Sequence, residues 1–297
     1  MRVLITGAGG FLGRHIARRF SEKGHEVTAV FRSKFSIPAS FMERANLRAV
    51  SVDLAEGAQG LPDDFEAVVH AAGNLSVDRS FSEVSRRDNV SATRTLIQRA
   101  VEVGARNFVF LSSTSVYGEV ADNILDASSI EKPTTLYGEM KLEAERVVAS
   151  TGSDLSSAAI RLPAVLGPRA HSVFIVETIR RILAGERVQV ANPDNLFNHI
   201  IHANDLSDFI DGAIHLIPDG FTAFPVGAGK PITIRDAIDR IQEKLGRNAD
   251  VEYTADEKRP NFTISSAYAT NTLNYQPAEV VDILDRYILE LPETPGC

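Results

Sequence analysis

Tyr137 and Lys141 are the residues whose types and spacing most directly suggest chemistry. They stand four apart at the start of a predicted helix announced by Pro133 and Thr134, so their side chains share one face of that helix. An ammonium beside a phenol stabilises the phenolate and lowers its pKa from about 10 toward neutrality. The pair therefore predicts a general acid or base that exchanges a proton with a substrate hydroxyl.

The preceding strand strengthens this interpretation, because a Y-x-x-x-K spacing alone is also typical of an ordinary surface helix. The segment NFVFLSSTSVYGE ends its apolar run in three hydroxyl residues, Ser112, Ser113 and Thr114. Open α/β folds bind ligands at this carboxyl edge of the sheet. A single serine there could be only a turn former. Hydroxyls one strand ahead of a Tyr/Lys helix instead favour a group that holds the substrate oxygen while its proton moves.

A glycine cluster near the N-terminus predicts a phosphate-binding turn. Gly7, Gly10 and Gly13 follow a short apolar strand and open a helix, in the order G-x-x-G-F-L-G, within a unit that covers residues 2–23. Glycine permits a tight turn with positive φ and a close approach of the backbone to a pyrophosphate, and the helix N-terminus supplies N–H groups. The alternative is a purely structural turn. The strand before and the helix after favour dinucleotide binding.

The end of the second strand indicates which dinucleotide binds. EVTAVF is followed by Arg32, Ser33 and Lys34, without the carboxylate that would bind an adenosine 2′-hydroxyl. Guanidinium and ammonium groups make charge-assisted hydrogen bonds to a 2′-phosphate. The other interpretation is a pair of solvated surface cations. We expect NADP(H) to be favoured over NAD(H).

Alternating strands and helices must position these residues. Helical patterns at 11–23, 81–103 and 137–149 separate short apolar runs, namely VLIT, EVTAVF, LRAVSV, EAVVH and NFVFLS. Such runs are typical of a parallel sheet covered on both faces. The sequence therefore predicts an α/β fold with a doubly wound parallel sheet. Residues 1–165 form the dinucleotide-binding domain, residues 166–297 form mainly a smaller, partly interleaved substrate lobe, and residues 198–217 return to the first domain.

Composition narrows the class of protein. The 297 residues are 44% hydrophobic and 24% charged, which is ordinary for a globular chain, and 31 basic against 39 acidic residues give a net charge of −8. That balance disfavours nucleic-acid binding. Cys297 is the single cysteine, so no intrachain disulfide is expected. Without a signal peptide or an apolar run of about 18 to 20 residues, we expect a cytoplasmic protein that does not enter membranes.

Together these motifs resemble the extended short-chain dehydrogenase/reductases of the NAD-dependent epimerase/dehydratase type, over nearly the whole chain. The resemblance implies a Rossmann domain and a catalytic triad of Ser113, Tyr137 and Lys141. It also implies cofactor contacts in the glycine loop, after the third strand, in the turn HAAG, in the helix DNVSAT and in RLPAVLGP. Those contacts, besides Tyr137, Lys141 and Arg32, are Gly7, Gly10, Phe11, Leu12, Gly13, Asp53, Leu54, Ala71, Ala72, Gly73, Asn89, Pro163 and Val165.

The resemblance is less specific for the substrate. It implies a nucleotide sugar, held by Ser113, Thr114 and Arg259, although an ordinary surface arginine would look the same. Asn198 stands where the epimerases that act on uridine diphosphate sugars usually carry an arginine, and Ala164 stands where they often carry an asparagine. Ser113-Thr114-Ser115 replaces the Thr-Asp-Glu of the dehydratases, which ranks a dehydratase lower.

The expected function is therefore hydride transfer between a nicotinamide and a carbonyl or secondary alcohol, as an oxidoreductase or an epimerase. The alternative class is a non-catalytic dinucleotide sensor, which would need no serine, tyrosine and lysine in register. His70 and His202 are interpreted as structural, and no metal site is expected. The helices at 81–103 and 137–149 resemble those that pair in homodimers of this family.

Overall fold

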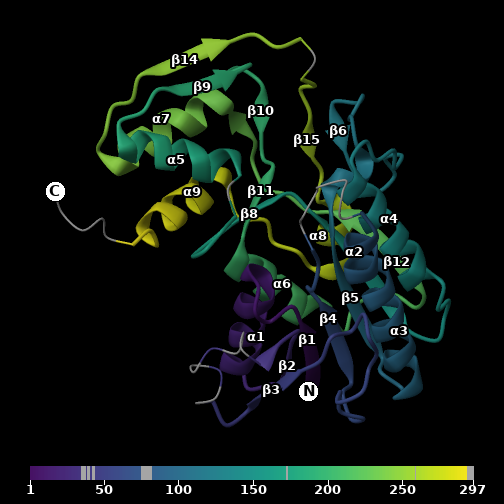
Figure 1. Cartoon of the computed structure of the whole chain (residues 1–297). Coiled ribbons are helices and arrows are strands. Elements are labelled where there is room, and N and C mark those ends of the chain that lie inside the picture. The colour runs from purple at the N-terminus through teal and green to yellow at the C-terminus, as the bar shows by residue number, and fades with distance from the viewer. Residues whose placement is uncertain are drawn as a thin grey trace.

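A central sheet with helices on both faces carries a smaller lobe above one end (Figure 1). The computed structural model describes residues 1–34, 38, 41, 44–74, 82–171, 173–257 and 259–292. In these parts the sheet has seven parallel strands in the order β12-β7-β5-β4-β1-β2-β3. They are β1 (Arg2–Thr6), β2 (Glu26–Phe31), β3 (Leu47–Ser51), β4 (Ala67–His70), β5 (Asn107–Ser113), β7 (Ser156–Leu162) and β12 (Phe221–Pro225). The expected doubly wound α/β fold is confirmed.

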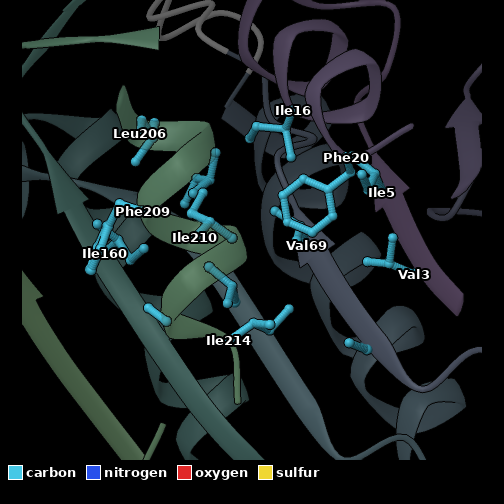
Figure 2. Close-up of a cluster of buried hydrophobic side chains, with 14 of the residues drawn as sticks. Val3, Ile5, Ile16, Phe20, Val69, Ile160, Leu206, Phe209, Ile210 and Ile214 are labelled. Atoms are coloured by element: carbon cyan, nitrogen blue, oxygen red, sulfur yellow. The ribbon is translucent and has the colours of Figure 1, made fainter. Parts of the chain in front are cut away.

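Apolar faces of helices cover both sides of this sheet. Helices α1 (Phe11–Glu22), α6 (Ala203–Ala213) and α8 (Ala267–Leu273) pack on one face, and α3 (Ala92–Glu102) and α4 (Leu136–Ala149) pack on the other. Figure 2 shows Phe20 of α1 beside the strand residues Ile5 and Val69, and Phe209 of α6 beside Ile160 of β7. Strand order reverses between β1 and β4, so their carboxyl ends open a crevice that can receive a ligand.

The helix expected at 81–103 contains a π-helical turn. It runs as α2 (Ser82–Arg86), the π-turn η4 (Arg87–Ser91) and α3. The Asn89 side chain donates to the carbonyl of Ser85, and Thr93 donates to the carbonyl of Asn89. Side chains that occupy helical carbonyls in this way widen the local hydrogen-bond ladder.

The C-terminal lobe has its own core. It contains α5 (Phe174–Ala184), α7 (Ile234–Leu245) and α9 (Val280–Leu289), with the pairs β9 (Val188–Ala191) and β14 (Val251–Thr254), and β10 (Leu196–Phe197) and β13 (Ile232–Thr233). Two short ladders lie between the lobe and the sheet, namely β8 (Ala164–Leu166) with β11 (Ile200–His202), and β6 (Ile124–Leu125) with β15 (Thr263–Ile264). A 3₁₀ turn, η5 (Thr114–Tyr117), follows β5.

The lobe is interleaved with the sheet domain, because α6, β12 and α8 return to the sheet between segments of the lobe. The exact domain boundaries expected from the sequence stay a prediction. In the described parts of the chain, no helix is both long and apolar enough to cross a membrane. Cys297 lies outside the described residues.

Candidate active site

Two adjoining cavities open at the carboxyl edge of the sheet, and most residues selected from the sequence line them. The glycine-loop cavity, of about 470 Å³, and the tyrosine cavity, of about 270 Å³, share Gly10, Ala71, Gly73 and His171. The expected residues in the first are Gly7, Gly10, Arg32, Asp53, Leu54, Ala71, Ala72 and Gly73. Those in the second also include Phe11, Leu12, Gly13, Ser113, Tyr137, Lys141, Pro163 and Val165.

The glycine loop has no room for side chains. Gly7 has a φ of +67°, and a Cβ there would lie 2.7 Å from the carbonyl carbon of Ala71. A Cβ at Gly13 would lie 2.2 Å from the carbonyl oxygen of Gly7. Gly10 begins α1 without a side chain to cap it. This bare backbone at a helix N-terminus fits the pyrophosphate of a dinucleotide.

The tyrosine cavity brings three predicted catalytic side chains together from β5 and α4. Ser113, the last residue of β5, lines the same cavity as Tyr137, and its hydroxyl influences the protonation of the phenol. Helix α4 begins after Thr135, whose hydroxyl accepts the backbone N–H of Gly138 at 3.1 Å, and this cap fixes the first turn that carries Tyr137. Lys141 lies one turn later, with its ammonium 5.8 Å from the centre of the Tyr137 ring.

Burial dominates the protonation of these groups. It raises the pKa of Tyr137 to about 12, against a smaller lowering by the nearby Ser113 hydroxyl. The expected lowering of the phenol pKa toward neutrality is not found in this structure, because burial disfavours the phenolate. Burial lowers the pKa of Lys141 to about 8, while the Glu145 carboxylate acts in the opposite direction. The phenol accordingly holds its proton, and the arrangement can donate it to an oxygen beside Ser113.

Arg32 lines the glycine-loop cavity but already has an acidic partner. Its Nη2 atom lies 3.0 Å from Oδ2 of Asp88, whose carboxylate is 1% exposed, while the arginine side chain is 56% exposed. Arg87 lies 3.3 Å from the other oxygen of Asp88 and 3.9 Å from Asp53. Lys34 is exposed and is not among the residues that line this cavity.

Asn89 lies behind the turn formed by residues 73–74 and lines neither cavity. Its side chain is buried, accepts the backbone N–H of Asn74 at 3.1 Å and donates to the Asn74 carbonyl at 3.2 Å. A Cβ at Gly73 would lie 3.1 Å from the Asn89 oxygen. The Asn89 amide therefore supports the backbone of residues 73–74 in this structure, and its direct contact with a cofactor stays a prediction.

The sequence interpretation missed His171 and Asp88. His171 lines both cavities and packs its ring edge-on to Phe11, with 5.9 Å between the ring centres. It lies in an irregular segment, where no periodic pattern indicates the direction of a side chain. Asp88 lines the glycine-loop cavity, and its position one residue before Asn89 in the DNVSAT segment could have indicated it.

Thr114 and Arg259 line a separate, mostly apolar lobe cavity of about 500 Å³. This cavity shares Pro163 and Ala164 with the tyrosine cavity. Arg259 is 67% exposed and pairs with Asp256 at 3.1 Å, at the exposed side of the cavity. The other lining residues include Phe174, Ile175, Phe197, Ile200, Ile234, Phe262 and Ile264, together with Gln189 and His199.

Asn198, which occupies the position of a family arginine, has a structural role. Its buried amide donates to the carbonyls of Ala228 and Ile264, at 3.0 and 2.8 Å, and its oxygen accepts the N–H of Ile264 at 2.8 Å. His199 beside it bonds the Phe262 carbonyl at 3.0 Å and stacks on the Phe262 ring at 4.4 Å. The Asn198 side chain is therefore occupied by protein groups, and it lines none of the three cavities.

The two histidines interpreted as structural have protein partners. His70 lies between the hydroxyls of Thr6 and Thr93, at 2.7 and 2.9 Å, and burial lowers its pKa to about 3. His202 accepts the N–H of Asn204 at the start of α6 and bonds Glu290 at 2.9 Å. Over the ranges that the structure covers, no group of three His, Cys, Asp or Glu side chains could hold a metal ion.

Comparison with known proteins gives a consistent result. Residues 3–220 match the model of the NAD dependent epimerase/dehydratase family. A 3-beta-hydroxysteroid dehydrogenase of Mycolicibacterium neoaurum is 26% identical, with 89% of this chain and 73% of that protein covered. UDP-glucose 4-epimerase 3 of Oryza sativa subsp. japonica is 25% identical, with 84% and 78% covered. The structure of MoeE5 in complex with UDP-glucose and NAD superposes with a TM-score of 0.79 at 26% identity, with 97% and 98% covered.

Proposed function

This chain belongs to the NAD-dependent epimerase/dehydratase family, and on that premise we propose that Ser113, Tyr137 and Lys141 are its catalytic residues. The bound nicotinamide would exchange hydride with a carbonyl or secondary alcohol carbon of the substrate. The observation that carries the proposal is a single cavity lined by Ser113, Tyr137 and Lys141 together with Gly13 of the glycine loop.

The three side chains have separate tasks in the proposed reaction. Ser113 holds the substrate oxygen, and Tyr137 donates its proton to that oxygen as the carbonyl is reduced. The raised pKa of Tyr137 suits this direction, because the phenol carries its proton at neutral pH. Lys141 donates to the Leu111 carbonyl at 2.8 Å, which fixes its ammonium beside the phenol. In an epimerase the same groups would act first as base and then as acid, with the cofactor retained.

We propose a nucleotide sugar as the substrate. Support comes from the similarity to MoeE5, whose structure contains UDP-glucose, and from Arg259 and Thr114 at the lobe cavity. Because Asn198 stands where related epimerases usually carry an arginine, Arg259 would have to bind a larger share of the charge of the sugar nucleotide's diphosphate.

The lining of the lobe cavity favours a second candidate, an apolar secondary alcohol or ketone. Phe174, Phe197 and Phe262 contribute rings to it, and Arg259 already pairs with Asp256. Apolar walls of this kind favour a ligand without charge. The similarity to a hydroxysteroid dehydrogenase is consistent with such a substrate.

Two finer proposals concern the cofactor and assembly. We propose that NADP(H) is preferred over NAD(H), because Arg32 presents an exposed guanidinium in the glycine-loop cavity. Its ion pair with Asp88 leaves less charge for a 2′-phosphate, so the preference should be moderate. We also propose a homodimer through the helices at 82–102 and 136–149.

Tyr137→Phe tests the catalytic assignment. Loss of the hydroxyl removes the proton donor and leaves the glycine loop intact, so turnover should fall by about 10² to 10⁴. NADPH absorbance measures turnover, and fluorescence titration should give a cofactor affinity within about twofold of the native value. Full turnover by this variant would refute the assignment.

A substrate panel separates the remaining candidates. The native protein is mixed with NAD(P)H and a 4-keto nucleotide sugar, or with a ketosteroid as the apolar candidate. Cofactor oxidation with one of them identifies the class of substrate. Binding of NADPH without its oxidation by any candidate carbonyl would favour the sensor.

A further inference from the structure

A buried ion pair lies next to the catalytic side chains, where Glu145 of α4 meets Arg161 of β7. Both side chains are 3% exposed. Arg161 Nη2 lies 2.7 Å from Glu145 Oε2, and Arg161 Nε lies 3.1 Å from Glu145 Oε1. Two parallel hydrogen bonds of this kind fix both groups in one orientation. Burying two charges brings little net stability, so the pair calls for another explanation.

Glu145 is directly linked to the strand that ends at Ser113. Its carboxylate accepts a hydrogen bond from the hydroxyl of Ser112, the residue before Ser113. Lys141, one helical turn before Glu145, donates to the carbonyl of Leu111, the residue before Ser112. Helix α4 therefore holds consecutive residues of β5 from one face, and the next residue carries the catalytic hydroxyl.

Glu145 also provides negative charge for Lys141. The Lys141 ammonium is buried, and burial disfavours its charged form, while the Glu145 carboxylate favours it. The other groups around Lys141 do not replace this effect. His70 of β4 is neutral, because burial lowers its pKa to about 3, and Tyr137 keeps its proton.

Arg161, the cation nearest to this carboxylate, is held by several partners. Its Nη2 atom also lies 2.6 Å from Glu131, and its Nη1 atom donates to the Tyr117 hydroxyl at 2.9 Å. Asn89 offers only a neutral amide on the side of Gly73, near Lys141. The Glu145 carboxylate thus pairs with Arg161, accepts the hydrogen bond of Ser112 and favours the charged form of Lys141.

We propose that Glu145 is a positioning residue of this active site, which fixes the end of β5 beneath Ser113 and keeps Lys141 an ammonium ion. The inference rests on the proposed function, because it assigns Glu145 a task only through Lys141 and Ser113. Glu145 itself lines neither the glycine-loop cavity nor the tyrosine cavity.

Lysine titration by NMR tests the electrostatic part without any substrate. The protein is labelled with ¹³Cε-lysine, and the Lys141 signal is assigned by its loss in Lys141→Arg. Glu145→Gln keeps the shape and a hydrogen-bond acceptor for Ser112, and it should lower the Lys141 pKa by about one unit. Glu143→Gln is the matched control, because Glu143 lies on the same helix and pairs with Arg86 near the surface. An unchanged Lys141 titration in Glu145→Gln overturns the proposal.

Glu145→Gln leaves the buried Arg161 charge without its carboxylate partner, and this can destabilise the fold. A second variant therefore separates misfolding from the proposed effect. Glu145→Gln combined with Arg161→Met removes both charges and fills the space with an apolar chain. This double variant should still show the lowered Lys141 pKa. A return of Lys141 to its native titration there would overturn the proposal, since it would trace the effect to the unpaired arginine.

The pH profile of turnover distinguishes a failure of the Glu145 proposal from a failure of the proposed function. In Glu145→Gln the alkaline limb of the profile should move to lower pH by the same shift as Lys141, and in Glu143→Gln it should stay. An unmoved limb, with Tyr137→Phe inactive, would reject Glu145 and leave the proposed function standing. Full activity of Tyr137→Phe would reject the function, while the lysine titration would still decide whether Glu145 holds Lys141 charged.

Discussion

Burial shifts the pKa values of Tyr137 and Lys141 in opposite directions. The phenol pKa rises to about 12 and the ammonium pKa falls to about 8. Both changes follow from one cause, since low polarity disfavours the charged form of each group. At neutral pH both groups therefore carry their protons. As the pH rises above about 8, Lys141 loses its proton and its positive charge. The Tyr137 phenol should lose its proton only at much higher pH.

Arg32→Ala tests the proposed cofactor preference. Loss of the guanidinium removes charge-assisted hydrogen bonds to a 2′-phosphate, so NADPH should bind about ten- to a hundredfold more weakly. Fluorescence titration measures the affinity. NADH provides the control ligand, because it lacks the 2′-phosphate, and its affinity should change little. Equal losses for both cofactors would show that Arg32 acts only through its ion pair with Asp88.

The turn between β1 and α1 shows how one element sets the site. Gly13 lies in the first turn of α1, against the backbone of Gly7, so helix and turn approach each other without side chains between them. The close approach brings the start of α1 to both cavities. The glycines therefore serve packing as well as the proposed phosphate binding.

Gly13→Ala should displace this turn. Its Cβ would lie 2.2 Å from the Gly7 oxygen, and we expect a loss of about 1–3 kcal/mol in the free energy of unfolding, with a much lower cofactor affinity. Urea unfolding and fluorescence titration measure the two effects.

Gly212→Ala is the control within another helix of the same face. A Cβ at Gly212 of α6 meets nothing within 4 Å, so alanine should leave stability unchanged or raise it by up to about 1 kcal/mol. If Gly13→Ala changed the free energy of unfolding no more than this control, the close packing of the turn would not contribute to stability.

At the scale of the whole molecule, α3 and α4 cover one face of the sheet, and apolar side chains of α2 and α3 are exposed to solvent on this side. Val84 of α2 is 46% exposed and Val101 of α3 is 38% exposed. A second copy of the chain on this side would cover them, as expected for the proposed homodimer.

Sedimentation at micromolar concentration should therefore give twice the mass of one chain. Val101→Glu places a charge in the proposed interface and should shift the equilibrium toward monomer. Leu216→Glu, an exposed residue after α6 on the other face, should leave the dimer intact. A native protein that sediments only as monomer would reject the interface.

Local patterns in the sequence predicted the sheet, the glycine loop and the Ser113, Tyr137 and Lys141 set, because each depends on neighbours along the chain. Strand and helix periods place Gly13, Ser113 and Tyr137 at one edge of a parallel sheet before any coordinates exist. The two cavities at that edge contain most of the selected side chains. Helix α6 lies within residues 198–217, for which a return to the first domain was predicted, and it packs on the sheet.

The tertiary structure alone decided the environment of each group. Burial of Tyr137 raised a pKa that spacing predicted to fall, and Asp88, the residue before Asn89, became the partner of Arg32, which follows β2. Asn198 and Asn89 proved to bond protein backbone. The sequence determines which residue types stand at which intervals, whereas desolvation and partner choice depend on groups brought together from distant segments.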